Sequence, residues 1–186
     1  GAFTPTCSNT HLPGYVVLMD KRGGPISGQP NWSSGFISAA YSGTLFRPSG
    51  DPILDLRGPE AITAAAQRAQ LDLLAELNQR HMDQRPGGRE LAARAQSYEL
   101  AFNMQAAAPE AVDLGGESEK TLSLYGVGDK VTDEFGRNCL IARRLVERGV
   151  RFVQLYSGGG HLEDTWDAHA GIESNHGKHA AEVDRP

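Results

Sequence analysis

The sequence contains only two cysteines, Cys7 and Cys139, and they lie far apart. Two such residues form neither the disulfide framework of a small secreted domain nor a cysteine-rich zinc site, and they leave the redox compartment open. Long apolar runs are also missing. The longest covers residues 15–19, whereas a membrane-spanning helix needs about 20 apolar residues. The sequence therefore predicts no disulfide-rich fold and no membrane span.

Positive charge is in deficit as well. The 186 residues include 18 Lys and Arg against 23 Asp and Glu, which gives a formal net charge of −5. A protein that binds DNA or RNA normally presents a basic face, so we expect no nucleic-acid partner. The hydrophobic share of 39% and the charged share of 22% are those of an ordinary globular protein, and the length suits one domain.

Two segments have the composition of strands buried in a sheet. Residues 15–19 form an unbroken apolar run, and residues 150–156 are mostly apolar and directly follow a helical pattern that stops at Gly149. A helix, a glycine and a strand in this order form half of a βαβ unit, which joins parallel strands. We therefore predict an α/β fold in which both strands belong to one parallel sheet, with the long helices packed outside it.

The other segments are predicted to form one long loop and several helices. Residues 20–58 are rich in glycine, proline and serine, which predicts a long irregular loop, either packed on the surface or closing over a site. In residues 60–107 apolar side chains recur every three or four positions on both sides of a Pro-Gly-Gly break. This pattern predicts a helical hairpin that ends before Pro109. Shorter helical patterns follow at residues 117–125, 132–148 and from 172 onward.

The balance of strands and helices is unusual for one domain. Sheets typically contain about five or six strands, and parallel strands need cover on both faces. Two strands do not offer enough surface to cover the apolar stripes of three long helices. We therefore expect residues 1–186 to form one partial α/β domain, incomplete at both ends, and the chain to be an internal piece of a larger protein.

Side chains that bind metals are concentrated after the second strand. Four of the six histidines lie between positions 161 and 179, behind three consecutive glycines. In parallel α/β sheets, ligands bind beyond the carboxyl ends of the strands. Asp167 and His169 project to the same side of an extended segment, so they could bind one divalent ion, and the glycines would let the backbone approach that ion. Further candidate ligands or site-lining residues are His161, Asp164 and His176.

The mixture of imidazole and carboxylate favours zinc, manganese or iron over magnesium or calcium. Residues 132–186 are then a helix, a strand, a metal-binding loop and a helix.

Three other interpretations concern the loop that follows the second strand. It could be a polar surface loop with solvated histidines. A phosphate-binding loop is disfavoured because Ser157 and the glycines are not followed by the Lys-Ser/Thr pair of a P-loop. A Ser-His-Asp catalytic triad is disfavoured because the sequence contains no Gly-x-Ser-x-Gly motif. No nucleophile can be named.

Several longer segments resemble one bacterial family. They are residues 12–18, 31–36, 50–56, 97–105 and 139–155, together with the motif Trp166-Asp167-Ala168-His169. Over nearly its whole length the chain resembles the domain of unknown function 1501 (DUF1501) family, a sulfatase-like branch of the alkaline-phosphatase superfamily.

The resemblance implies a three-layer αβα sandwich around a mostly parallel sheet. It also implies hydrolysis of phosphate or sulfate esters with one or two metal ions held by Asp and His. Asp167 and His169 match the Trp-Asp-x-His motif as ligands, and His161 and His176 match less securely as site-lining residues. Family members are often exported, which implies an extracytoplasmic location. The family's nucleophile segment and an Asp-His pair do not occur here, so we expect residues 1–186 alone to be inactive.

Two functions follow as hypotheses. The first is a metal-dependent hydrolase of sulfate or phosphate esters, acting on a small-molecule or glycan ester, with this chain supplying part of the metal site. The second is a non-catalytic binding or cell-surface protein that keeps the same fold. A complete set of ligands together with a nucleophile would favour the enzyme.

Overall fold

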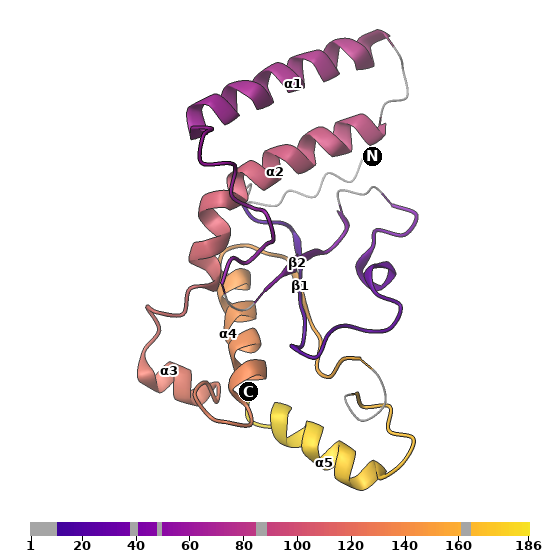
Figure 1. Cartoon of the computed structure of the whole chain (residues 1–186), viewed down its shortest axis with the longest axis vertical. Coiled ribbons are helices and arrows are strands. Elements are labelled where there is room, and N and C mark those ends of the chain that lie inside the picture. Colours follow the sequence, from indigo (N-terminus) through magenta and orange to yellow (C-terminus); the bar gives the residue numbers. More distant parts are fainter. Residues whose placement is uncertain (1–10, 38–40, 48–49, 85–88, 161–164) are drawn as a thin grey trace.

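A computed structural model describes residues 11–37, 41–47, 50–84, 89–160 and 165–186 (Figure 1). The fold is α/β, with an open sheet of three parallel strands in the order β2-β1-β3. The strands are β1 (Tyr15–Leu18), β2 (Thr44–Phe46) and β3 (Phe152–Leu155). The prediction that residues 15–19 and 150–156 contribute parallel strands to one sheet is confirmed.

The central strand β1 forms the middle of the hydrophobic core. Val16, Val17 and Leu18 are fully buried, and burial of each such side chain contributes about 1.5–3 kcal/mol. Val16 and Leu18 point to the same face, where α2 and α4 supply the opposing apolar side chains. The core cluster consists of Leu12, Val16, Leu18, Phe46, Leu56, Met104, Ala108, Ala111, Val112, Ile141, Leu145 and Val150.

The helices largely follow the predicted pattern. They are α1 (Ala64–Gln84), α2 (Arg89–Val112), α3 (Glu119–Leu124), α4 (Asp133–Glu147) and α5 (Ile172–Val183), with a short 3-10 turn, η1 (Gln29–Trp32). One boundary was wrong, because α2 continues past Pro109. The helix tolerates this proline close to its end, and Figure 1 shows α2 changing direction in its last turns, as expected near a proline.

Two expectations need correction. The segment 20–58 is not irregular throughout, because it contains β2, which pairs with β1. The apolar face predicted for α1 does not pack on the sheet: no residue of α1 is buried, and Leu73 and Leu77 are exposed. In Figure 1, α1 lies beside α2 and away from the strands. Within the described residues, no helix is both long and apolar enough to cross a membrane.

Candidate functional site at the carboxyl ends of the strands

The carboxyl ends of the three parallel strands meet at one edge of the sheet. Asp20 to Arg22 follow β1, Arg47 follows β2, and Tyr156 and Ser157 follow β3. These residues line a cleft of about 820 Å³, whose remaining wall comes from the start of α4 and from Glu182 on α5. Ligands of parallel α/β proteins bind at this edge, and the volume lies in the range of small-molecule sites.

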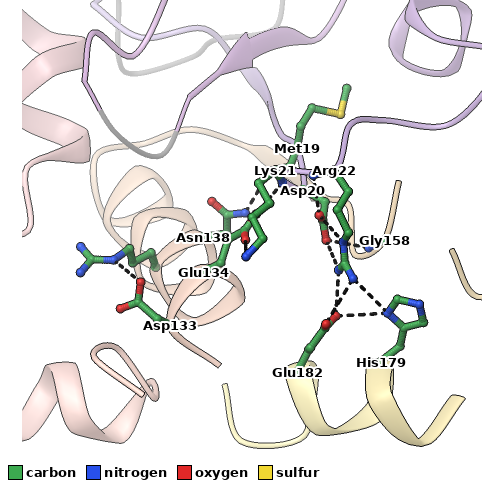
Figure 2. A network of polar contacts seen from close by, with 11 residues as sticks. Met19, Asp20, Lys21, Arg22, Asp133, Glu134, Asn138, Gly158, His179 and Glu182 are labelled. Atoms are coloured by element: carbon green, nitrogen blue, oxygen red, sulfur yellow. Dashed lines mark hydrogen bonds and ion pairs between the residues drawn. The ribbon is translucent and has the colours of Figure 1, made fainter. Parts of the chain in front are cut away.

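An ion network at the end of β1 borders this cleft (Figure 2). The Asp20 carboxylate accepts hydrogen bonds from the Arg22 guanidinium, with Nη2 2.6 Å from Oδ2 and Nε 2.8 Å from Oδ1. Asp20 and Arg22 are largely buried, with side-chain exposures of 7% and 17%. A charge this far from water is stable only when it is paired and hydrogen-bonded.

Arg22 extends the network to helix α5. Its Nη2 lies 2.8 Å from Oε2 of Glu182, and its Nη1 lies 3.4 Å from Nδ1 of the fully buried His179. His179 Nδ1 is itself 3.1 Å from Glu182 Oε2. Figure 2 shows the guanidinium lying between the end of β1 and the side chains of α5. One arginine therefore joins two elements that are about 160 residues apart in the sequence.

The network keeps both carboxyl groups ionised. Burial alone would raise the pKa of Asp20, but hydrogen bonds from Arg22 and from the Gly158 backbone N–H outweigh it and lower that pKa. Burial likewise acts to raise the pKa of Glu182, and hydrogen bonds from Arg22 and His179 more than offset it. The hydrogen bond to Asp20 is the largest cause of the raised pKa of Arg22.

The glycine-rich loop after β3 packs against the turn after β1. The backbone N–H of Gly158 donates to Asp20 Oδ2 at 2.8 Å. A Cβ atom at Gly159 would lie 2.2 Å from the carbonyl oxygen of Gly23, so only glycine fits there. The sequence predicted that these glycines let the backbone approach an ion. In the structure, the close approach that they permit is to the backbone of residue 23.

Trp166 anchors the next segment, which carries the predicted ligands. Its indole ring packs against His176 and His179 of α5, with ring centroids 5.8 and 5.4 Å away. His176 Nε2 donates to the Trp166 carbonyl oxygen at 2.8 Å, and the indole Nε1 lies 3.4 Å from Ser157 Oγ. The loop is thus attached to α5 and to the end of β3, beside the cleft.

Asp167 and His169 lie together, as the alternation of side chains predicted. The Asp167 Oδ2 atom is 3.4 Å from His169 Nε2, and the side chains are 86% and 69% exposed. Two donors bound to one tetrahedral ion at about 2.0–2.1 Å would lie about 3.3–3.4 Å apart. The spacing fits two ligands of a zinc-sized ion, although a long hydrogen bond gives the same distance. The predicted proximity is confirmed, and the role as ligands stays a prediction.

The other candidate ligands are placed only in part. His161 and Asp164 lie outside the described residues. His176 uses Nε2 to hold the Trp166 carbonyl, which leaves Nδ1 as the nitrogen with which it could bind a metal. Among the residues that the structure describes, no three His, Cys, Asp or Glu side chains are grouped so that they could hold a metal ion.

The ion network was not predicted from the sequence. The rule that pointed to residues after β3 applies equally to Asp20 and Arg22, which directly follow β1, so these two could have been found. Glu182 and His179 gave no local signal, because their contacts with Arg22 bridge 160 and 157 residues.

The fold and the site define an α/β protein with a polar cleft of ligand size at the carboxyl edge of a parallel sheet. The model of the family described as "Protein of unknown function (DUF1501)" matches residues 5–186, and the chain therefore belongs to this family. No curated protein and no solved structure matches the chain.

Proposed function

We propose that this protein is a divalent-metal-dependent hydrolase of phosphate or sulfate esters and that Asp167 and His169 are two of the metal ligands. Its substrate would be a small-molecule or glycan ester, its fold an alkaline-phosphatase-like αβα sandwich, and its location extracytoplasmic. The observation that carries the proposal is the Asp167–His169 pair, 3.4 Å apart on a loop beyond a strand end. A divalent ion bound there would polarise the ester and stabilise its developing negative charge.

The residues around the loop support this proposal because they anchor Trp166, which directly precedes the pair. Metal ligands need neighbours that orient them, and losing one such neighbour typically costs about 10–100-fold in affinity or activity. Here Trp166 precedes Asp167 directly, and His176 binds the Trp166 carbonyl. His179 connects the indole ring to the Arg22 network. The Asp167 side chain is 86% exposed, so its carboxylate is open to an ion from solvent.

Substitution of either proposed ligand tests the function. In the natural, full-length protein we expect Asp167→Asn and His169→Gln each to reduce zinc- or manganese-dependent hydrolysis of 4-nitrophenyl phosphate or sulfate by about 100-fold or more, since each removes a metal ligand. Folding should be unaffected because both side chains are exposed.

The matched control is His81→Gln on α1, which removes an exposed imidazole remote from the sheet and should leave the rate unchanged. Metal-dependent turnover that survives both ligand substitutions would contradict the assignment. The alternative, a non-catalytic binding protein, is favoured by the lack of a third donor among the described residues. It predicts no metal-dependent turnover of either ester by the full-length protein.

A further inference from the structure

We propose that the cleft at the carboxyl edge of the sheet binds a small organic anion with an apolar body, and that Arg47 and Lys130 recognise its anionic group. This assignment rests on the proposed function in one respect, because the bound anion is taken to be the ester that the protein hydrolyses. The cleft adjoins the loop of Asp167 through Ser157, which lines the cleft and lies 3.4 Å from the Trp166 indole nitrogen.

The charges around the cleft favour an anion. Five cationic and four acidic side chains line it. Every acid already has a basic partner: Lys21 pairs with Glu134 at 2.8 Å and Arg137 with Asp133 at 2.9 Å. Asp20 and Glu182 share Arg22, at 2.6 and 2.8 Å.

Two cations are left over. Arg47 donates from Nε to the Asp51 carbonyl oxygen at 3.2 Å, and neither Arg47 nor Lys130 has a carboxylate partner within the described part of the chain. Arginine and lysine side chains with unmet charge are the usual partners of phosphate, sulfate and carboxylate groups. Because Asp20 and Glu182 share one arginine, the lining as a whole carries a formal charge of +1 and complements a ligand with one negative charge.

The apolar side chains in the walls of the cleft favour a ligand that also has an apolar part. Leu45 and Val131 line the cleft and are exposed, although aliphatic side chains of this size are usually covered. Met19, Phe46 and Phe135 continue the apolar lining. Small-molecule sites typically combine such a surface with a few polar groups that set the orientation. An inorganic ion alone would leave this surface exposed.

An unsatisfied acceptor in the wall adds a third requirement. Asn138 on α4 is 1% exposed, and its Nδ2 donates to the Met19 carbonyl oxygen at 3.2 Å (Figure 2). Its Oδ1 has no hydrogen-bond partner among the described residues. A buried acceptor without a partner is unfavourable and rare in native proteins. Because Asn138 lines the cleft, a hydroxyl or N–H group of the ligand would satisfy it.

Binding of a ligand that cannot be hydrolysed tests the inference separately from the enzyme activity. The probe is 6-hydroxynaphthalene-2-sulfonate, which carries an anionic group, an apolar body and a donor, titrated calorimetrically into metal-free protein. We expect one site per chain. The Arg47→Gln/Lys130→Gln variant should bind at least tenfold more weakly, and 2-naphthol, which lacks the anion, should also lose about tenfold. Naphthalene-2-sulfonate, which lacks the donor, should lose about threefold to fivefold.

The control variant Lys120→Gln/Arg151→Gln removes the same charge from α3 and from the amino end of β3, and it should bind like the wild type. Equal losses in the two double variants, or no binding at millimolar probe, would overturn the inference. Because no metal and no ester bond are involved, these results do not depend on catalysis. Selective binding by a full-length protein that hydrolyses neither aryl ester would keep the cleft assignment and overturn the proposed hydrolysis.

Discussion

Replacing Arg22 with glutamine is expected to lower the free energy of unfolding by about 3 kcal/mol, because it leaves two largely buried carboxylates without their cation. Asp20 and Glu182 would then repel each other across the gap between β1 and α5. The effect is measurable from the urea midpoint at pH 7, followed by tryptophan fluorescence. Adding Glu182→Gln to Arg22→Gln should recover part of the loss, since it removes one of the uncompensated charges.

The neighbouring ion pair is the control. Lys21 binds Glu134 at 2.8 Å, but its side chain is 75% exposed. Exposed pairs contribute about 0–1 kcal/mol, so Lys21→Gln should change stability by less than about 1 kcal/mol. If the two single variants were equally stable, the Arg22 network would not be what joins α5 to the sheet.

Replacing Gly136 with alanine should be at least as damaging. This glycine is buried in α4, and a Cβ atom there would lie 1.9 Å from the Tyr125 carbonyl oxygen. Ordinary contacts between carbon and oxygen are about 3.3–3.6 Å. The carbonyl has little room to retreat, because Thr132 Oγ1 donates to the adjacent Gly126 carbonyl at 2.8 Å. Overpacking typically costs about 1–3 kcal/mol, and a clash with backbone should cost about 3 kcal/mol or more.

A second helical glycine provides the comparison. Gly177 lies in α5 with no atom within 4 Å of where a Cβ would stand. Gly177→Ala should therefore stabilise the protein by about 0.5–1 kcal/mol, because alanine has the higher helix propensity. Thermal unfolding of the two variants should shift the midpoint in opposite directions. Similar shifts would mean that the contact at Gly136 relaxes easily.

Local patterns predicted the elements whose signal lies in neighbouring residues. The helix stop at Gly149 is an example: its φ is +90°, and the Val150 N–H bonds back to the Leu145 carbonyl at 3.0 Å, which starts β3 in the expected place. The three residues of β2 could not be predicted in this way, because only pairing with β1 makes them a strand. For α1, periodicity predicted an apolar face but carried no information on what would cover it.

The same distinction applies to the site. Asp167 and His169 are two positions apart, so backbone alternation alone placed their side chains together. The Arg22 contacts with α5 depend on how distant elements pack, and no local pattern reports that. The cleft likewise combines residues from three strand ends and from α4, so its unpaired cations and the Asn138 acceptor became visible only in the folded chain.

The central claim is that a divalent ion binds between Asp167 and His169, and paramagnetic broadening of histidine ring signals by manganese(II) tests it most directly. Unpaired electrons broaden the NMR signals of nearby nuclei even when binding is weak, so the test does not require a complete ligand set. Sub-stoichiometric manganese should broaden the signals of His169 first and leave those of His81 sharp, and Asp167→Asn should remove this selectivity. Uniform broadening of all histidines, or unchanged selectivity in the variant, would contradict the claim.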